Sequence, residues 1–485
     1  MGWRPSSAGW WRHGNAVRSK RDARVDRRVT PLRVAIVGAG PAGYYAADHL
    51  LRQDSVPVEV DMFDRLPTPY GLVRLGVAPD HQKIKSVTAA FDKVAANPRF
   101  RFFGGVELGR DVTVDDLRKH YHQILYSTGA QTDRRMGIPG EDLTGSHPAT
   151  EFVAWYNGHP DYRDCVFDLS VERAAVVGVG NVAVDVVRIL CRSPEELAKT
   201  DIADHALEAL RQSRIREVYM LGRRGAAQAA FTNPEVKELG ELPDADLIVR
   251  PDEVEFDPVS RAALDAAPDR ATTKKVEILQ EYARRAPAGK RKRLLARFLV
   301  SPVEVLGDAR GHVRALRLVK NRLEASDRGP QAKATGEVEE IPVGLVFRSV
   351  GYKGLALPGV SFDERSAVIP NDKGRVLDPQ TKTPRVGEYA AGWIKRGPSG
   401  VIGTNKPDAG ETVACMLEDA AAGSTLKPSG DGAAIERFVR ERQPRCVTYA
   451  DWKTLDRLEI DRGRPDGRPR VKFCTVEDMF KALGR

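Results

Sequence analysis

The stretch "RVAIVGAGPAGYYAADHLLRQ", residues 33–53, decides how the first part of the chain folds. An apolar run leads into a glycine-rich turn and then an amphipathic pattern, which predicts a strand, a tight turn and a helix. Gly38, Gly40 and Gly43 give this turn the spacing GxGxxG. Such glycines allow a tight turn, a close approach of the backbone to a pyrophosphate, and packing of the helix on the strand. The unpaired N–H groups at the helix N-terminus attract phosphates.

A second apolar run, "VEVDMF" at 58–63, follows the predicted helix and ends at Asp64. An acidic residue at this strand end accepts hydrogen bonds from a ribose with a free 2′-hydroxyl. A lone GxGxxG is a weak signal, but here strand, turn, helix, second strand and acid follow in the expected order. The pattern predicts a dinucleotide site, and the acid at Asp64 suits FAD.

The same arrangement recurs in "RAAVVGVGNVAVDVVRIL", residues 173–190. Gly178, Gly180 and Ala183 form GxGxxA between a predicted strand and a predicted helix. Two nucleotide-binding units in one chain suggest that one takes a flavin and the other a nicotinamide cofactor.

The next strand-like run, "REVYML" at 216–221, ends in Gly222, Arg223 and Arg224 instead of an acid. Arginines donate charge-assisted hydrogen bonds to a 2′-phosphate, which an acidic residue would repel. At about 1.5–3 kcal/mol for each bond to a charged group, the pair would favour NADPH over NADH by about 10²–10⁴-fold. This run lies further from the second glycine loop than usual, and we expect extra helix over 195–212 to fill the gap.

Two apolar runs end alike in Ser-x-Gly: "ILYSTGA" at 124–130 and "LVFRSVGY" at 345–352. Each fits a strand that leaves one domain for the other, although two unrelated strand–turn junctions would look the same. Between them, 257–292 and 320–340 are predicted to be surface excursions. Near the C-terminus, glycines and an aromatic residue in 389–417 precede a predicted helix whose N-terminus would stabilise a reduced, anionic flavin ring, although a glycine-rich loop before an ordinary capped helix would look the same.

Composition limits the classes of function. Hydrophobic residues make up 41% of the 485 residues and charged residues 29%, as in ordinary globular proteins of two or three domains. The five cysteines are widely spaced and form no CxxC, which argues against a disulfide framework, a cysteine-held iron–sulfur cluster or a redox-active dithiol. A reducing compartment is expected. The net charge of +9 favours an acidic protein partner, because no nucleic-acid-binding motif is present.

The first 30 residues are basic and lack apolar periodicity, which is typical of a disordered extension. A transit peptide is the alternative, although Asp22 and Asp26 are unusual in one. The expected location is therefore the cytoplasm, or the mitochondrial matrix if 1–30 is a transit peptide. No apolar stretch is long enough to predict membrane insertion.

Five motifs in order resemble the ferredoxin–NADP reductases of the adrenodoxin-reductase type over about residue 31 to the end, with a tail closer to bacterial members. These motifs are "GPAGYYAADHLL", "PYGLVRLGVAPDH", "GVGNVAVDVVRIL", "LGRRGAAQAAFTNPEVKEL" and "GWIKRGPSGVIGT". The resemblance implies an α/β fold with two Rossmann-like dinucleotide-binding domains, in which an NADP domain is inserted into a discontinuous FAD domain. The implied divisions are 1–30 (extension), 31–132 and 352–485 (FAD domain), and 133–351 (NADP domain).

The resemblance also implies the site residues. For FAD, the implied residues added to the glycine loop are Ala42, Asp64, Leu72, Leu108, Trp393 and the backbone of Gly400, Val401 and Ile402. For NADP, they are Val179, Gly180, Asn181, Val182, Arg223, Arg224, Glu235 and Gly400. His81 and Glu238 match two polar residues near the junction of flavin and nicotinamide, and are the implied catalytic residues.

The sequence departs from the family at two of these positions. Asp64 stands where the family usually has Glu, which shortens the side chain toward the ribose by one carbon. Val179 replaces Asn or Gln in the second glycine loop and removes one side-chain contact.

The implied activity is that of a ferredoxin–NADP(+) reductase with FAD and NADP as cofactors. NADPH would give hydride to FAD, which would pass single electrons to a separate, small acidic ferredoxin. A cytochrome P450 system downstream is the family's common destination. The alternatives are an electron-input module resembling the small subunit of glutamate synthase, and a nucleotide-sensing protein without turnover. Two basic clusters, 211–216 and 290–297, are candidate docking sites for the ferredoxin, and the second is preferred. The alternative for each cluster is an ordinary solvated face, which is the commoner role of such charges.

Overall fold

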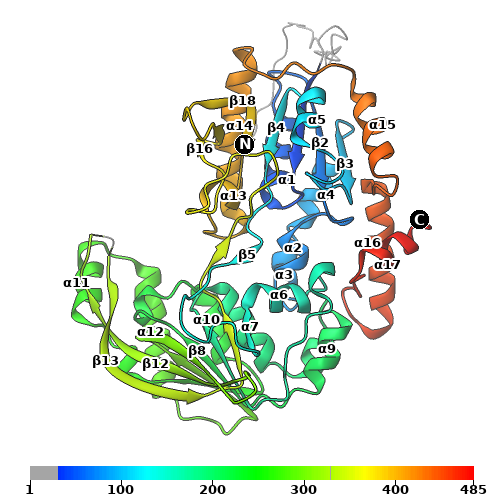
Figure 1. The fold of residues 1–485 in the computed structure, drawn as a ribbon. Helices are drawn as coiled ribbons and strands as arrows, with labels where there is room; N and C mark the ends of the chain where they lie inside the picture. Colours follow the sequence, from blue (N-terminus) through cyan, green and yellow to red (C-terminus); the bar gives the residue numbers. More distant parts are fainter. Residues whose placement is uncertain (1–30, 328) are drawn as a thin grey trace, which may run out of the picture.

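The computed structural model describes residues 31–327 and 329–485, and the predicted extension 1–30 lies outside the described residues. The chain forms two lobes, each built on its own sheet (Figure 1). The sheet of the first lobe takes its strands from both ends of the described chain, and that of the second lobe takes them from the middle.

A seven-stranded sheet forms the first lobe. In spatial order its strands are β16 (Asn371–Asp372), β17 (Arg375–Leu377), β18 (Pro384–Ala390), β4 (Gln123–Tyr126), β1 (Leu32–Val37), β2 (Val58–Asp64) and β3 (Phe100–Gly104). The five strands from β18 to β3 are parallel. The register pairs Val37 with both Phe63 and Tyr126, so β1, β2 and β4 end at one edge. Parallel strands bring their carboxyl ends together, and ligands of such sheets bind at that edge.

A six-stranded, all-parallel sheet forms the second lobe. Its strands are β6 (Ser146–Pro148), β14 (Leu345–Arg348), β7 (Arg173–Val177), β8 (Glu217–Leu221), β10 (Lys292–Arg297) and β9 (Ala245–Val249). Val177 pairs with both Leu221 and Arg348, so β7, β8 and β14 end together, as in the first lobe.

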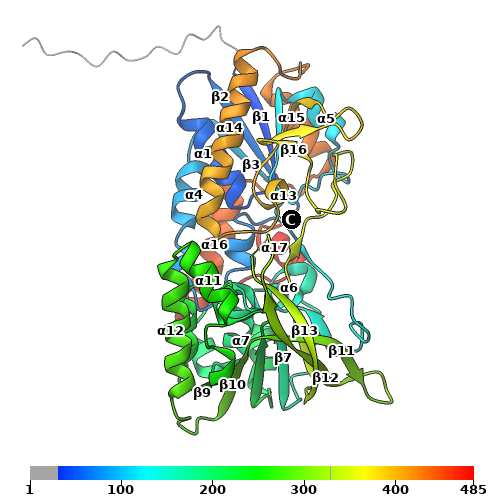
Figure 2. The same cartoon turned by 90° about the vertical axis from the view of Figure 1, so that its left-hand side faces the viewer.

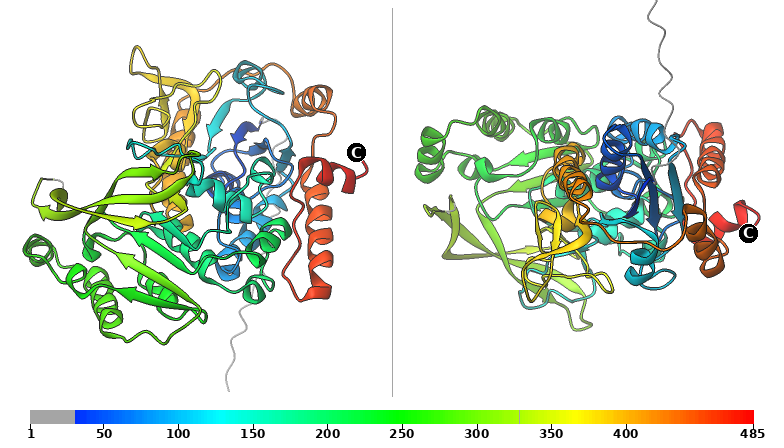
Figure 3. Two further views of the ribbon diagram at one scale, coloured as in Figure 1. Left: turned by 60° about the horizontal axis from the view of Figure 1, so that its bottom comes forward. Right: turned by 90° about the horizontal axis from the view of Figure 1, so that it is seen from above.

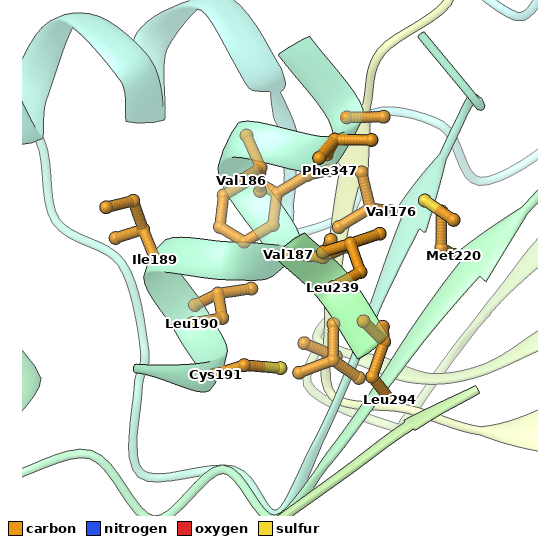
Figure 4. Packing of buried hydrophobic residues seen from close by; sticks show 14 of the residues in the cluster. Val176, Val186, Val187, Ile189, Leu190, Cys191, Met220, Leu239, Leu294 and Phe347 are labelled. Carbon is orange, nitrogen blue, oxygen red and sulfur yellow. The ribbon is translucent and has the colours of Figure 1, made fainter. Parts of the chain in front are cut away.

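Different layers cover the two faces of the second sheet. Val176, Met220 and Phe347 point to the face covered by helices, where they join the largest buried apolar cluster (Figure 4). Alternate residues, such as Val177 and Leu221, point to the opposite face and pack against an antiparallel sheet. That sheet consists of β11 (Val300–Gly307), β12 (Val313–Glu324) and β13 (Gln331–Pro342). The helices of this lobe are α6 (Ala149–Tyr156), α7 (Asn181–Cys191), α8 (Pro194–Leu197), α9 (Asp204–Arg211), α10 (Asn233–Gly240), α11 (Pro258–Ala266) and α12 (Arg270–Arg284), with the 3₁₀ turns η1 (Pro160–Tyr162), η2 (Ala226–Gln228) and η3 (Pro251–Glu253).

The helix expected over 195–212 is confirmed as α8 and α9. The prediction that 257–292 and 320–340 are surface excursions is wrong. The first forms α11 and α12, and α12 buries Val276 and Leu279 in the core of the second lobe. The second supplies most of β13 and the end of β12. Nearly every residue of β13 is at least partly exposed, so its polar composition resembles that of a loop.

Helices also cover both faces of the first sheet. On one face α1 (Pro41–Arg52) packs beside the long α14 (Asn405–Ala421), as Figure 2 shows. The glycine-rich 389–417 thus leads into the predicted helix. The remaining helices are α2 (Leu72–Leu75), α3 (Gln82–Lys85), α4 (Thr88–Ala95), α5 (Val114–His120), α13 (Trp393–Arg396), α15 (Gly432–Arg442), α16 (Tyr449–Gly463) and α17 (Val476–Ala482), with the 3₁₀ turns η4 (Ile402–Thr404) and η5 (Arg464–Asp466).

Two connections fix the lobes to each other. β5 (Thr132–Asp133) pairs with β15 (Tyr352–Lys353), directly after the two Ser-x-Gly segments. The C-terminal end of the chain lies on the other side, away from the antiparallel sheet (Figure 3). Near that end, buried Lys472 donates hydrogen bonds to the backbone carbonyl and the side-chain oxygen of Asn157. Buried Lys85 of the first lobe pairs with Asp201 of the second at 2.7 Å. These contacts fix the position of the carboxyl edge of one sheet relative to the carboxyl edge of the other.

Candidate functional site

The first glycine loop joins β1 to α1 and leaves one side of its backbone open. Gly38 has a φ of +107°, and a Cβ there would lie 2.6 Å from the carbonyl oxygen of Ser127. A Cβ at Gly43 would lie 2.4 Å from the carbonyl oxygen of Gly38. At Gly40, by contrast, a Cβ would meet no atom of the described residues within 4 Å. The first and third glycines are thus required by packing, whereas Gly40 faces space that a ligand can fill.

Asp64 ends β2 beside this loop and orders it. Its carboxylate accepts hydrogen bonds from the Ala39 amide at 2.8 Å and the Leu66 amide at 2.9 Å. Burial raises the pKa of Asp64, and the two amide hydrogen bonds oppose that rise. Ala39 lies within the glycine loop, so the hydrogen bond from its amide means that the Asp64 side chain holds the loop itself.

Two further segments border the open side of Gly40. The Tyr70 amide donates to the Ala39 carbonyl at 2.8 Å, and a Cβ at Gly71 would lie 3.1 Å from the Gly40 Cα. Leu72, the next residue, is 38% exposed although it is large and apolar. It directly follows Gly71 and therefore lies close to the open side of the loop.

The C-terminal glycine segment reaches the same place from the other side. A Cβ at Gly392 would lie 2.6 Å from the Cβ of Ala42 in α1, and the Gly392 amide donates to Asp408 of α14 at 2.5 Å. Trp393 follows, and its ring lies 5.4 Å from that of Tyr352. The start of α14 thus lies beside the start of α1.

The residues just before α14 are open. Gly400 has a φ of +77°, Val401 is 53% exposed, and Ile402 begins the turn η4. Leu108 lies further away, in the loop after β3, where the Val106 amide donates to the carbonyl of Asp64. The structure therefore gathers the predicted FAD residues around one edge of the first sheet.

The second glycine loop repeats the geometry of the first. Gly178 has a φ of +139°, and a Cβ there would lie 2.2 Å from the carbonyl oxygen of Ser349. Gly180 faces no described atom within 4 Å of an added Cβ. The two Ser-x-Gly segments thus hold equivalent places in the two lobes. The Oδ1 atom of Asn181 is buried without a hydrogen-bond partner in the part of the chain that the structure describes.

Arg223 and Arg224 follow β8 at the same edge. Neither guanidinium forms an ion pair or a hydrogen bond with any residue in 31–327 or 329–485. Arg223 is exposed and Arg224 half-buried. Burial lowers the pKa of Arg224, and the adjacent Arg223 lowers it further. Two neighbouring cations without carboxylates form a ready site for a phosphate.

Val179, Val182 and Glu235 complete the predicted second site. Val179 would contact a Cβ at Gly222 at 2.9 Å, so it packs between the glycine loop and the arginines. Val182 lies in the first turn of α7 and packs against the core of the lobe. The carboxylate of Glu235 accepts a hydrogen bond from the Thr232 amide at 2.7 Å and caps α10.

The predicted catalytic pair comes together across the lobes. The Nε2 atom of His81 lies 3.1 Å from the Oε2 atom of Glu238, although 157 positions separate them. On its other side, His81 Nδ1 lies 3.8 Å from the Asp185 carboxylate and 3.5 Å from the Arg188 guanidinium. Fully buried Arg188 also bonds Asp80 at 2.7 Å.

Comparison with known proteins places this architecture. The model of the pyridine nucleotide-disulphide oxidoreductase family matches residues 32–234. The NADPH-ferredoxin reductase FprA of Mycobacterium leprae is 46% identical over 455 residues, which cover 92% of this chain and 97% of that protein. The mitochondrial NADPH:adrenodoxin oxidoreductase of Homo sapiens is 43% identical over 463 residues, or 93% of this chain and 92% of that protein.

The chain belongs to the ferredoxin–NADP reductases of the adrenodoxin-reductase type. A solved structure of Mycobacterium tuberculosis FprA in complex with NADPH matches this reductase with a TM-score of 0.88 at 45% identity, and the match covers 94% of this chain and all of that one. No helix in the described part of the reductase is long and apolar enough to cross a membrane.

Sequence reasoning missed several residues of the reductase that shape the site. Asp80, Asp185 and Arg188 surround His81, and Asn321 contacts the backbone of Arg223. Asp185 and Arg188 lie in the quoted stretch 173–190, but the spacing of its apolar residues does not show that these two side chains face the other lobe. Asn321 carries no sequence signal at all.

The structure does not support a docking surface at the preferred basic cluster. Lys292 and Arg297 of β10 are buried, and Arg293 pairs with Glu217. The Arg293 amide donates to the Arg216 carbonyl, so 211–216 and the start of 290–297 lie at the amino-terminal edge of the second sheet, whereas Arg297 pairs with Leu221 at the carboxyl edge. The two glycine loops of the reductase lie at the carboxyl edges of their sheets.

Proposed function

We propose that the reductase binds FAD at the first glycine loop and NADP at the second, and transfers electrons from NADPH to a separate ferredoxin. FAD and NADP are its cofactors. The observation that carries the proposal is the Arg223–Arg224 pair, because two guanidiniums without a partner among the described residues, beside an open glycine loop, suit a 2′-phosphate. The names of the relatives, NADPH-ferredoxin reductase and NADPH:adrenodoxin oxidoreductase, support the same activity.

The described residues fit both groups. The open side of Gly40, the exposed Leu72 and the exposed Val401 suit FAD. The open side of Gly180, the unpaired Oδ1 atom of Asn181 and the arginine pair suit NADP. The residues proposed to hold FAD are Gly38, Gly40, Ala42, Gly43, Asp64, Leu72, Leu108, Trp393, Gly400, Val401 and Ile402. Those proposed to hold NADP are Val179, Gly180, Asn181, Val182, Arg223, Arg224, Glu235 and Gly400.

When bound, FAD accepts hydride and releases electrons singly, which the protein cannot do alone. The protein orients the nicotinamide and handles the proton. Oxidation of one NADPH by two one-electron acceptors releases one proton. We propose that His81 takes it up and passes it from Nε2 to Glu238, whose side chain is 43% exposed and so reaches solvent. The buried Asp185 and Arg188 hold the other side of the imidazole.

We propose that the domains divide as the family pattern implies, with 133–351 inserted between 31–132 and 352–485. The pairing of β5 with β15 supports these limits, because both crossings between the lobes pass through this short ribbon.

The proposed partner is a small, acidic ferredoxin. The net charge of +9 supports an acidic partner. A cytochrome P450 system downstream and a cytoplasmic location are further proposals. Support for the location comes from the five cysteines, all of which are unpaired, as expected in a reducing compartment.

One experiment separates this proposal from its two alternatives. The purified protein should be yellow with non-covalent FAD, anaerobic NADPH should bleach the flavin absorbance, and added ferredoxin should restore it. A nucleotide sensor without turnover would show no bleaching. A module that feeds one fixed partner subunit would bleach but would not reduce a free ferredoxin. Correctly folded protein that takes up no FAD would contradict the proposal as a whole.

A further inference from the structure

The loop that carries the two arginines is tied down at successive carbonyls. The Gly222 carbonyl accepts a hydrogen bond from the Val300 amide at 3.0 Å, and the Arg224 carbonyl accepts one from the Leu299 amide at 3.1 Å. Leu299 adopts a φ of +55°, which is unusual for a residue other than glycine. The two donors are the backbone amides of the first residue of β11 and of the residue immediately before it, so the antiparallel sheet fixes the two ends of the loop.

The carbonyl between them, that of Arg223, is held by a side chain. The Nδ2 atom of Asn321 donates to this carbonyl and to the Ser301 hydroxyl, both at 2.8 Å. Asn321 is buried, and its own amide donates to the Leu299 carbonyl at 2.7 Å. It lies where the register of β12 against β13 shifts, after Val319. A bulge of this kind re-aims a side chain.

The hydrogen bond from Asn321 to the Arg223 carbonyl restrains a loop that would otherwise change its conformation. Arg223 and Arg224 are adjacent cations without a carboxylate partner among the described residues, so repulsion drives them apart. A fixed carbonyl restricts the backbone of Arg223 and therefore the cone in which its guanidinium moves. Two guanidiniums bind one phosphate well only if they are held in place beforehand.

We propose that Asn321 is a positioning residue for cofactor specificity: by holding the Arg223 carbonyl it directs the arginine pair to the 2′-phosphate of NADP(H), without contacting the nucleotide. This inference rests on the phosphate-binding role proposed above for the pair.

The test compares the affinities of 2′,5′-ADP and 5′-AMP by titration calorimetry of the FAD-loaded protein. The ratio of the two dissociation constants isolates the 2′-phosphate. Asn321→Ala should lower the preference for 2′,5′-ADP by about tenfold. It should leave 5′-AMP affinity, FAD content and NADH-dependent ferricyanide reduction near those of the unmodified protein.

Ser301→Ala is the matched control, because it removes the other partner of Asn321 and leaves the bond to Arg223 in place. It should keep the preference. An equal loss in Ser301→Ala would overturn the proposal, as would an unchanged preference in Asn321→Ala. If Asn321→Ala does not hold FAD, Asn321→Ser is used with the same expectations.

The double variant Arg223→Ala/Arg224→Ala separates the phosphate-binding role of the pair from the positioning role of Asn321. If it leaves the preference unchanged, the phosphate-binding role of the pair is wrong and the role of Asn321 falls with it. If it abolishes the preference while Asn321→Ala has no effect, only the positioning role is wrong.

Discussion

The first and the second glycine have different roles in each of the two glycine loops. In each loop the first glycine adopts a positive φ against the backbone of a serine that directly follows a neighbouring strand, and the second faces open space. Gly40 and Gly180 have φ values of −86° and −105°, which any residue can adopt. Substitutions at these two positions therefore test the binding of a ligand and do not introduce backbone strain.

Gly40→Ala should fold but hold FAD about 10–100-fold more weakly, because a methyl group overfills a close contact at about 1–3 kcal/mol. Gly180→Ala should retain FAD and raise the KM for NADPH by a similar factor. Flavin absorbance and steady-state kinetics measure the two effects. Each variant serves as the control for the other, and loss of FAD in both would contradict the assignment of one loop to each cofactor.

The arginine pair gives the second prediction at this scale. Arg223→Ala/Arg224→Ala should lower the NADPH/NADH ratio of kcat/KM by about 10²–10⁴-fold. The effect should lie in the KM for NADPH, because contacts to the phosphate do not change during hydride transfer. Arg214→Ala/Arg216→Ala, at the opposite end of β8, is the matched control. An unchanged ratio in the first variant would rule the pair out.

At the scale of elements, the C-terminal segment joins the lobes through buried charge. Lys472 lies next to Asp201, at 3.3 Å, and to Lys85. Burial lowers the pKa of Lys472 to about 7 from the ordinary 10.5, although Asp201 raises it. The unfolded chain thus binds more protons than the folded chain between about pH 7 and 10. Stability contributed at this site must rise with pH in that window.

Lys472→Met should flatten this dependence. Relative to the variant, the unmodified protein should gain about 1 kcal/mol of stability per pH unit, or about 1–2 °C in Tm, from pH 7 to 9. Release of flavin fluorescence on heating measures Tm. Lys481→Met, an exposed lysine on α17, is the control and should keep the slope of the unmodified protein. Equal slopes in Lys472→Met and the unmodified protein would show that Lys472 does not titrate in this range.

At the scale of the whole molecule, the carboxyl edges of both sheets hold the glycine loops, and the exposed cations of the two basic clusters lie at the opposite, amino-terminal edge of the second sheet. A ferredoxin bound there would lie on the wrong side of that sheet from the first glycine loop. Exposed charges act through encounter, and at 0.15 M salt they are screened beyond about 8 Å.

Reversal of the exposed cations Arg214, Arg216 and Arg291 to Glu should therefore leave ferredoxin reduction within about twofold at 0.15 M salt. Arg293 is left unchanged because it pairs with Glu217. Stopped-flow measurement of the second-order rate checks this, with ferricyanide reduction as the control. A tenfold loss confined to ferredoxin would place the docking site at this edge after all.

The sequence by itself determined the features that local chemistry controls. Glycines at 38, 40, 178 and 180 are read from spacing because a turn and its helix are formed by neighbours in the chain. The arginines after β8 are equally local. The strands of 320–340 and the helices of 257–292 were not predicted, because the polar residues on their exposed faces have the composition of a loop.

Only the tertiary structure decided which distant residues meet. His81 reaches Glu238 across 157 positions, and Asn321 reaches Arg223 across 98. No period or motif records such contacts, because they depend on how the two lobes and the four sheets of the described chain pack. The physical reason is that a side chain's hydrogen-bond partner is chosen by the packing of the whole fold, whereas the turn that presents a nucleotide is chosen by the few residues that form it.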